Sequence, residues 1–469
     1  MVFASNAFLF FFLPITLILY WLAHKKRALS NAVLTVMSLL FYAWGEPKFV
    51  LVMLLSILIN WLAALGIEKL NGKQTRRKLL LAAGIAANVA ILGVFKYADF
   101  AIGSINSLLG VQIPLTGIAL PIGISFFTFQ AMSYIIDVYR GKGKAQKHFG
   151  NVCLYISFFP QLIAGPIVRY ETIAGEIEGR QETSADFYEG ARRFMVGYAK
   201  KAILANAMAK LVDYVFALPA GGMTVTLSWM GAACYLIQVY YDFSGYSDMA
   251  IGLGRMFGFH FLENFDFPFI AKSVTEFWRR WHISMCTWFR DYVFFPLGGS
   301  RVKTKRRLAF NMLVVWLLTG LWHGADWTYV CWGLLFFAVL LTEKLTGLAK
   351  WMEKHAVGHL YAMVAVTVIT VLIRSVSISA AFGYIKTMFG FGGAAFADRL
   401  TWFVFKEYLW YIIAAVVCSL PLGRCIKRRL RIPDGVWEVA CGVAIAALML
   451  IAVANTSATG YNPFIYYNF

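Results

Sequence analysis

Charged residues are scarce in this sequence. Asp, Glu, Lys and Arg make up 14% of its 469 residues, against roughly 25% in an ordinary soluble protein. A disordered chain needs high charge and few apolar residues, so this composition excludes one. A long coiled coil is excluded as well, because its exposed positions are largely charged.

Cysteine pairs and common catalytic motifs are missing too. The seven cysteines show no paired spacing, so we expect small buried hydrophobic residues rather than a disulfide scaffold. The sequence contains no H-E-x-x-H and no G-x-S-x-G motif, and the glycines between 252 and 258 lack dinucleotide-binding spacing. We expect Gly254 and Gly258 to allow close helix packing instead. His355 and His359 have no nearby cysteine or carboxylate pair, so no metal site is predicted.

Apolar residues fill the sequence. Hydrophobic residues account for 60% of the chain and aromatic residues for 17%. Apolar runs recur at lengths close to the roughly 20 residues with which a helix crosses a bilayer. The composition therefore requires a lipid bilayer as the solvent of this protein.

Basic residues outnumber acidic ones, 43 to 24, for a net charge of +19. In a soluble protein such an excess would indicate a nucleic-acid partner. Here the basic residues gather in short blocks between apolar runs, which is typical of cytoplasmic loops in membrane proteins. We therefore predict no nucleic-acid partner. The blocks are 24–27, 73–78, 140–147, 200–201, 301–307, 344–354 and 424–431.

The alternation of apolar runs and basic blocks predicts an all-α polytopic membrane protein with about 10–12 transmembrane helices. Residues 97–118 are interrupted by glycine and proline and are expected to lie in the membrane interface. The predicted spans are 7–23, 30–44, 49–68, 79–96, 119–137, 308–322, 327–342, 357–374, 402–421 and 437–455, with 150–168, 202–218 and 226–243 as further candidates.

The middle of the chain is different. Residues 244–300 contain too many charged side chains for a spanning helix. We expect short horizontal or re-entrant helices there, buried in protein or lying at the cytoplasmic interface. The whole chain, 1–469, is predicted to form one transmembrane domain, with N-terminal helices at 1–140, a core at 141–345 and C-terminal helices at 346–469.

Residues 273–289 are predicted to form one helix. Ser273 and Glu276 have the spacing of a capping box at its start. At helical spacing, Trp278, Trp281 and His282 share a face with Met285 and Phe289. The basic residues beside that face are Arg279, Arg280 and Arg290. Such a helix can simply anchor a protein at lipid headgroups, although an anchor does not explain the histidine.

The second candidate site is the run from Trp322 to Trp327, which contains His323 and Asp326. The preceding apolar run, 308–322, is only about 22 Å long as a helix, so His323 should lie within the membrane. Buried titratable groups in membranes are functional candidates, and a neutral imidazole can accept a hydroxyl proton. Asp326 can orient the imidazole if the helix continues through Gly324. The alternative is a hydrogen-bonded packing histidine between tryptophans.

Taken together, these segments resemble the membrane-bound O-acyltransferase family, in particular its alginate O-acetyltransferase branch. The resemblance covers nearly the whole chain. It rests on "MVFASNAFLFFFLPITLILYW" from Met1, "FYAWGEP" from Phe41, "LPIGISFFTFQAMSYIIDVYRG" from Leu120, "FFPQLIAGPIVRY" from Phe158, "YYDFSGYSDMAIGLGRMFGF" from Tyr240, "NFDFPFIAKSVTEFWRRWHISMCTWFRDYVFFPLGGSR" from Asn264 and "GLWHGADWTYVCWG" from Gly320.

The resemblance implies a ring of tilted helices around a central channel, in the inner membrane of a bacterium. It implies an acyltransferase that moves an acetyl group from acetyl-CoA or an acyl-carrier thioester in the cytoplasm. The implied acceptor is a hydroxyl of an extracytoplasmic polysaccharide, or of an SGNH-type partner transferase. No permanently bound cofactor is implied.

By the same resemblance, His323 and His282 are the catalytic residues. His323 is expected to act as general base, and His282 to stabilise the oxyanion or hold the donor. Asp326 would orient His323, with Trp322, Trp278 and Trp281 in support. The phosphates of the donor are expected to meet Arg279, Arg280 and Arg290, although positive-inside topology explains these residues equally well.

Two other classes of function fit the composition. A transporter or channel would use the intramembrane carboxylates Asp242, Asp248 and Asp326 as an ion path. A scaffold of a secretion complex would tolerate substitution of both histidines.

Overall fold

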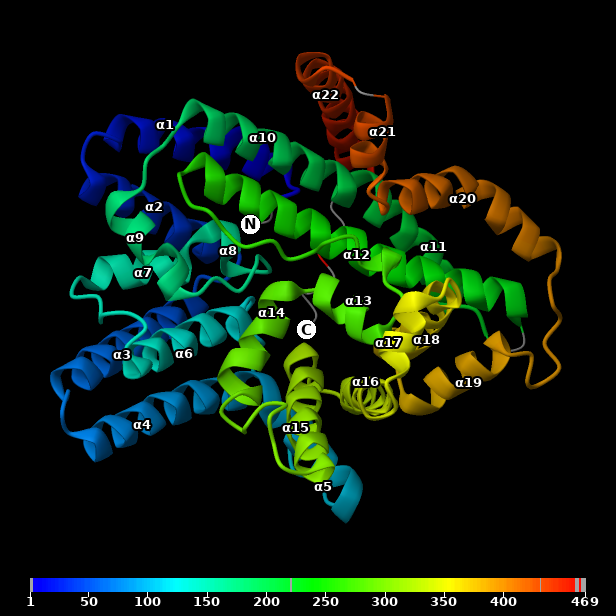
Figure 1. Cartoon of the computed structure of the whole chain (residues 1–469), viewed down its shortest axis with the longest axis horizontal. Helices are drawn as coiled ribbons and strands as arrows, with labels where there is room; N and C mark the ends of the chain where they lie inside the picture. Colours follow the sequence, from blue (N-terminus) through cyan, green and yellow to red (C-terminus); the bar gives the residue numbers. More distant parts are fainter. Residues whose placement is uncertain (1–2, 220–221, 431, 460–463, 465–469) are drawn as a thin grey trace. The chain divides into compact units, whose positions relative to one another are not determined.

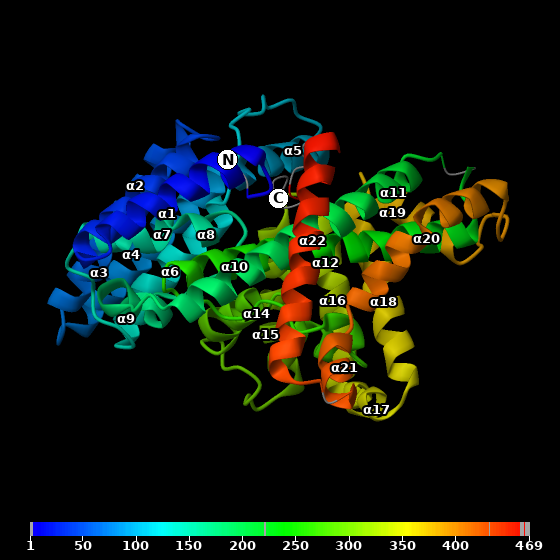
Figure 2. The ribbon, with the colours of Figure 1, turned by 90° about the horizontal axis from the view of Figure 1, so that it is seen from above.

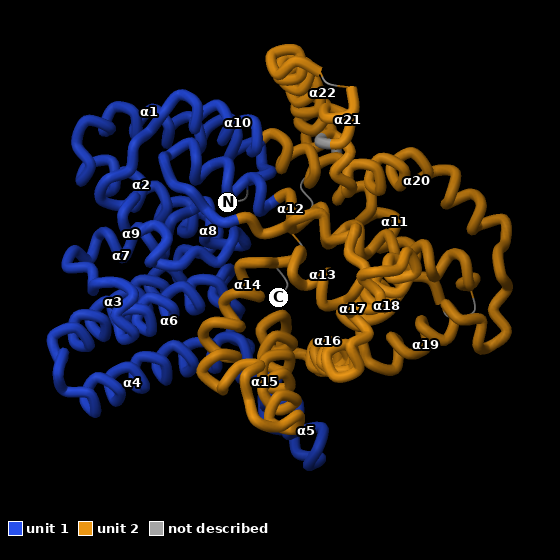
Figure 3. The backbone as a smooth tube through the Cα atoms, viewed as in Figure 1, with its two compact units in different colours: residues 1–194, 246–262 blue, residues 195–245, 263–469 orange. Residues whose placement is uncertain are grey.

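The regular elements are all helices in the part of the chain that the computed structural model describes, residues 3–219, 222–430, 432–459 and 464. The chain divides into two compact units, residues 1–194 with 246–262 and residues 195–245 with 263–469 (Figure 3). Two of the three boundaries between them fall within helices, α10 (Ser184–Ala199) and α12 (Val225–Met256), and the third lies between residues 262 and 263, after α12 has ended. The single domain predicted for 1–469, with its three segments, stays a prediction.

The first unit is built from helices of the N-terminal part of the chain. In it, α3 packs against α4 and α6, and α2 packs against α1 and α7 (Figure 1). Its elements are η1 (Phe8–Phe12), α1 (Leu13–Ala23), α2 (Arg27–Ala43), α3 (Phe49–Lys69), α4 (Gln74–Leu92), η2 (Gly93–Tyr97), α5 (Ala98–Leu109), α6 (Ile124–Arg140), α7 (Phe149–Ser157), α8 (Phe159–Leu162) and α9 (Tyr170–Gly179).

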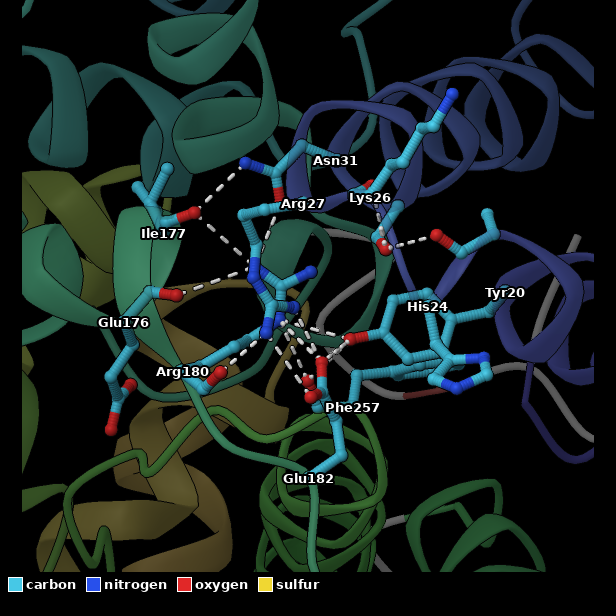
Figure 4. A network of polar contacts seen from close by, with 12 residues as sticks. Tyr20, His24, Lys26, Arg27, Asn31, Glu176, Ile177, Arg180, Glu182 and Phe257 are labelled. Atoms are coloured by element: carbon cyan, nitrogen blue, oxygen red, sulfur yellow. Dashed lines mark hydrogen bonds and ion pairs between the residues drawn. The ribbon is translucent and has the colours of Figure 1, made fainter.

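A buried arginine ties several elements of this unit together (Figure 4). Nε of Arg180 donates to the hydroxyl of Tyr20 and to the backbone carbonyl of Phe257, each at 3.0 Å. The carboxylate of Glu182 accepts hydrogen bonds from Tyr20 and from Arg27, the latter with an N–O distance of 2.5 Å. Arg27 of the first basic block therefore has a structural partner in addition to its place in a predicted cytoplasmic loop.

The second unit holds the remaining helices. In it, α15 packs along α16, and α16 packs against α18. Figure 2 shows α22 along its full length. The elements after α10 are η3 (Lys200–Ala205), α11 (Asn206–Phe216), η5 (Pro268–Ile270), α13 (Val274–Arg280), α14 (Ile283–Phe289), η6 (Arg290–Phe294), α15 (Lys305–His323), α16 (Trp327–Thr346), α17 (Leu348–Lys354), α18 (Val357–Arg374), α19 (Ile378–Met388), α20 (Arg399–Cys418), α21 (Leu422–Leu430) and α22 (Asp434–Thr459).

Six helices among the described residues are long and apolar enough to cross a membrane. They coincide with six predicted spans and confirm an all-α, multi-pass membrane protein. The helices at Phe8–Ala23 and Arg27–Ala43 are apolar but shorter. The predicted total of about 10–12 spans and the central channel stay predictions. The six are Phe49–Lys69, Gln74–Leu109, Trp327–Thr346, Val357–Arg374, Arg399–Cys418 and Asp434–Ala458.

Three local predictions are wrong. Residues 97–109 are not broken at Gly103, because they continue the helix that starts at Gln74 and the chain turns only at Gly110, with φ of +67°. The expected place of residues 97–118 in the membrane interface stays a prediction. Residues 150–168 are not one span, because the helix breaks between α7 and α8 at Phe158, whose ψ is 112°. The close helix contact involves Gly252, where an added Cβ would lie 2.5 Å from the carbonyl oxygen of Gly190, while Gly258 lies beyond the end of α12.

Candidate active site

His323 is the last residue of α15 and is only 6% exposed. Thr304 caps the start of the helix, and its hydroxyl accepts a hydrogen bond from the backbone N–H of Arg307 at 3.2 Å. It ends because Gly324 is extended, with φ of −167°. An added Cβ at Gly324 would lie 2.2 Å from the ring of Tyr329, so only glycine fits directly after the histidine.

Two glycines bring α15 and α16 unusually close. An added Cβ at Gly320 would lie 2.5 Å from the backbone oxygen of Tyr329, and one at Gly333 would lie 2.5 Å from that of Trp316. This close approach sets Trp332 of α16 against His323, with ring centroids 4.9 Å apart. The preceding residue, Trp322, lies at the same centroid distance from His323.

His282 interrupts the helix that was predicted for 273–289. The chain forms α13 and α14 instead, and His282 between them has φ of +46° and ψ of +51°. This left-handed conformation is uncommon for any residue other than glycine. The predicted shared face of Trp278, Trp281 and His282 on one helix is therefore wrong. The break turns the imidazole into the interior, where it is 0% exposed.

The side chain of Asn264 holds the imidazole of His282. Oδ1 of Asn264 lies 3.2 Å from Nδ1 of His282 and accepts hydrogen bonds from Ser284, at 3.2 Å from its backbone nitrogen and 2.9 Å from its hydroxyl. The backbone N–H of Ile283 donates to the carbonyl of Asn264 at 3.0 Å. Asn264 is 0% exposed, so these contacts are fully inside the protein.

The two histidines lie near each other in an aromatic environment. Their ring centroids are 6.4 Å apart. The ring of Phe243 on α12 lies 4.6 Å from that of His282, edge to face, and the ring of Trp322 lies 5.6 Å from it. Complete burial, and to a lesser extent the neighbouring His323, hold the pKa of His282 well below its ordinary value. The neutral imidazole is therefore the resting form of His282.

Three buried nitrogens around these rings have no hydrogen-bond partner among the described residues. They are Nε2 of His282 and Nε1 of Trp278 and Trp332. The ring of Trp332 lies 5.8 Å from that of Trp278 and 4.9 Å from that of His323. Buried polar atoms are normally satisfied, so unsatisfied ones grouped near two histidines indicate a place for a polar ligand.

A buried carboxylate anchors the helix that leads to His282. Glu343 of α16 is 1% exposed. It accepts hydrogen bonds from the backbone nitrogens of Val274 and Thr275, both at 2.8 Å, and from the hydroxyl of Thr275 at 2.5 Å. Free N–H groups at a helix start favour negative charge. Glu343 thereby fixes α13 against α16.

Of the two hydrogen bonds of the capping box predicted for Ser273 and Glu276, the structure confirms one. The hydroxyl of Ser273 accepts a hydrogen bond from the backbone N–H of Glu276 at 2.9 Å. The carboxylate of Glu276 accepts from the backbone N–H of Lys272 at 2.9 Å, where a capping box would use that of Ser273. Trp281 follows α13, with its ring stacked on that of Phe277 at 5.2 Å.

Comparison with known proteins identifies this architecture. The profile of MBOAT, the membrane-bound O-acyltransferase family, matches residues 146–386. The chain belongs to the membrane-bound O-acyltransferase family. It is 36% identical to the probable alginate O-acetylase AlgI of Azotobacter vinelandii, over 100% of both chains. It is 43% identical to the protein of that name from Pseudomonas syringae pv. tomato, over 84% of this chain and 76% of the relative.

A more distant relative is the peptidoglycan O-acetyltransferase of Helicobacter pylori, 34% identical over 73% of this chain and 70% of that one. These membrane-bound O-acyltransferase relatives are named for acyl transfer to different polymers. This chain is accordingly an acyltransferase. The roles predicted for its individual site residues stay predictions.

Asp326 does not occupy the position that was predicted for it in this membrane-bound O-acyltransferase. The helix does not continue through Gly324, and Asp326 directly precedes α16, where its carboxylate accepts a hydrogen bond from the backbone N–H of Thr328 at 2.8 Å. Its side chain therefore serves as a helix cap. Among the described residues no cluster suited to a metal ion occurs.

The three arginines predicted to hold donor phosphates each lie beside a carboxylate. Arg280 contacts Asp266 at 3.0 Å and Glu276 at 2.9 Å, and Arg290 contacts Asp291 at 2.9 Å. Arg279 is 65% exposed and lies 4.0 Å from Glu353. Of the three, Arg279 is the most accessible to an incoming anion, and the other two already have close ion-pair partners.

The carboxylates that a transporter would use are also engaged. Asp242 pairs with Lys201 at 2.5 Å, and Asp248 pairs with Arg193 at 2.9 Å. Asp326 caps α16. These three side chains thus have structural partners in this membrane-bound O-acyltransferase, which counts against an ion path through them.

Sequence reasoning missed two residues of this site. Asn264 stands in a quoted motif, but nothing in its spacing connects it with His282, 18 positions later. Glu343 follows a predicted span and looks like an ordinary residue of a cytoplasmic loop. The one available signal was an acidic residue at the end of an apolar run, next to the block 344–354.

Proposed function

We propose that this acyltransferase moves an acetyl group from a cytoplasmic thioester, acetyl-CoA or an acyl-carrier thioester, to a hydroxyl outside the membrane. The acceptor hydroxyl belongs to an extracytoplasmic polysaccharide or to a partner transferase of the SGNH type that passes the group on. The membrane is the bacterial inner membrane. The observation that carries this proposal is the pair of buried imidazoles with ring centroids 6.4 Å apart.

The reaction needs two kinds of group, and a histidine pair can supply both. The hydroxyl oxygen attacks the thioester carbonyl carbon, a C–O bond forms, the C–S bond breaks and the thiol leaves. One group must accept the hydroxyl proton, and another must donate a hydrogen bond to the oxyanion of the tetrahedral intermediate. Nε2 of His282 and Nε1 of Trp332, whose ring contacts His323, are buried without a partner among the described residues and are suited to such polar ligands.

The surroundings of the histidines also favour this chemistry. The rings of Phe243, Trp322 and Trp332 contact them, and aromatic walls exclude water. In such a low-dielectric site, hydrogen bonds to a developing charge are stronger than in water. Water exclusion further protects the activated acyl group from hydrolysis.

A thioester assay separates this function from its rivals. The purified protein is given acetyl-CoA with a labelled acetyl group, with water and then alginate oligosaccharide as acceptors. We expect release of free thiol with both acceptors, faster with the sugar, and labelled ester on the sugar. A carrier would move label across a vesicle membrane with the thioester intact. Absence of thiol release from well-folded protein, with acetyl-CoA and with an acetylated carrier protein, would overturn the proposal.

A further inference from the structure

The orientation of the Asn264 amide is fixed by its neighbours. The backbone N–H of Ser284 can only donate, and it lies 3.2 Å from Oδ1 of Asn264. The hydroxyl of Ser284 adds a second donor at 2.9 Å. If the amide oxygen and nitrogen of Asn264 were exchanged, its NH2 group would face the backbone N–H of Ser284, and two donors cannot form a hydrogen bond. The oxygen must therefore face Ser284.

This orientation determines the tautomer of His282. Nδ1 of His282 lies 3.2 Å from the same amide oxygen. Because an amide oxygen only accepts hydrogen bonds, Nδ1 must carry the hydrogen. In a neutral imidazole the other nitrogen, Nε2, then has a lone pair and no hydrogen. That atom is buried and has no partner within the described part of the chain.

The backbone around His282 is held in place for this arrangement. The left-handed conformation of His282 costs energy in an ordinary residue and persists only where surrounding contacts enforce it. Asn264 supplies them through its carbonyl, which accepts from the N–H of Ile283 at 3.0 Å, and through its side chain. Strain enforced in this way is typical of functional sites, and its effect here is to direct the ring of His282.

We propose that Asn264 is a positioning residue that fixes His282 as its Nδ1–H tautomer, and that Nε2 of His282 accepts the proton of the attacking hydroxyl. The inference rests on the proposed acyl transfer. It exchanges the roles expected from sequence, in which His323 was the base and His282 the oxyanion donor. A neutral imidazole with a bare Nε2 can accept a proton there and cannot donate a hydrogen bond from it.

The reaction balances with these roles. As the hydroxyl oxygen bonds to the carbonyl carbon, its proton moves to Nε2 of His282, and His323 donates a hydrogen bond to the oxyanion. When the C–S bond breaks, His282 returns the proton to the leaving sulfur. During the transfer Oδ1 of Asn264 continues to accept the Nδ1–H, which stabilises the cationic ring, as an asparagine does beside a catalytic histidine in the Cys-His-Asn arrangement.

The test compares Asn264→Ala with Asn264→Asp in the thioester-to-alginate-oligosaccharide assay. We expect Asn264→Ala to lower kcat about 100-fold with KM nearly unchanged, since a general base contributes about 10²–10⁴-fold. Asn264→Asp keeps the acceptor oxygen and adds a negative charge that favours the protonated ring. We expect it to stay active and to shift the acidic limb of the kcat–pH profile to higher pH.

A buried asparagine without a histidine contact provides the control. Asn311 is 0% exposed and donates to the carbonyl of Gly299 at 3.0 Å. Asn311→Ala should lower stability without moving the pH profile. The groups that face His282 are Phe243 of α12, Asn264, and Trp322 and His323 of α15. Of these, only His323 is titratable. The pH profile is therefore also measured in a protein that carries His323→Gln, where an acidic limb that persists belongs to His282.

Each outcome has a distinct meaning. A wild-type protein that releases no thiol overturns the proposed acyl transfer, and this inference with it. With an active wild type, an Asn264→Ala variant whose kcat stays within threefold overturns the inference alone. Should Asn264→Ala fail to fold, Asn264→Asp decides, because an unshifted pH profile in that nearly isosteric variant contradicts the role of Asn264.

Discussion

Replacing Glu343 removes the anchor of α13. Its carboxylate accepts from two backbone nitrogens at 2.8 Å and one hydroxyl at 2.5 Å. Glu343→Ala leaves the two N–H groups without an acceptor, and each such group costs about 1–3 kcal/mol. We therefore expect the free energy of unfolding to fall by about 2–6 kcal/mol. Glu343→Gln keeps one acceptor oxygen and loses one charge-assisted hydrogen bond, for about 1.5–3 kcal/mol.

Equilibrium unfolding in mixed detergent micelles measures these differences. The exposed neighbour Lys344 provides the control, since Lys344→Gln should change the free energy of unfolding by less than about 0.5 kcal/mol. Because α13 leads directly into His282, acyl transfer should weaken in the order Lys344→Gln, Glu343→Gln, Glu343→Ala. A Glu343→Ala protein that unfolds at the wild-type midpoint would refute the anchoring role of this carboxylate.

Three further predictions concern the surroundings of the histidines and the first unit. Gly324→Ala places a Cβ 2.2 Å from the ring of Tyr329, directly after His323, so acyl transfer should fall at least tenfold. Wild-type activity in this variant would show that the ring of Tyr329 moves aside freely. Asp326→Ala should lower the free energy of unfolding by about 0.5–2 kcal/mol, because the helix loses its cap. Asp326→Asn still caps the helix and should keep wild-type acyl transfer, and a large loss of acyl transfer in Asp326→Asn would restore the predicted orienting role. Partial burial opposes a charge on His260, but hydrogen bonds to Glu176 and Asp186 prevail and raise its pKa. The stability that these contacts add is complete below the ordinary histidine pKa and is lost as pH rises through the raised pKa of His260. Thermal unfolding temperatures of wild type and His260→Gln should therefore differ below that raised pKa and converge above it.

The apolar spans were predictable because they depend on local composition. A run of about 20 apolar residues is sufficient to define a membrane helix, whatever surrounds it. The helix 74–109 is longer than the predicted span 79–96, because Gly103 was given too much weight as a helix breaker. The start of α13 at Ser273 was likewise a local signal, carried by a side chain three residues from its partner.

The arrangement of the site depends on contacts between distant residues. The periodicity of 273–289 is helical, yet the chain breaks at His282, where Asn264 supplies hydrogen bonds from 18 residues away. Glu343 reaches α13 across 69 positions. Such pairings follow from tertiary packing, which overrides local preference. Sequence therefore identified both histidines as candidates but did not predict the break or the anchors that position them.

The central claim is that the two buried histidines carry acyl transfer from a thioester to a hydroxyl. The most direct measurement is the formation of labelled ester on an alginate oligosaccharide outside proteoliposomes that contain acetyl-CoA inside. Wild type, His323→Ala and His282→Ala are compared at equal amounts of folded protein. We expect ester formation by the wild type and a loss of at least 100-fold in each variant. Ester formation at the wild-type rate in either folded variant would contradict the account.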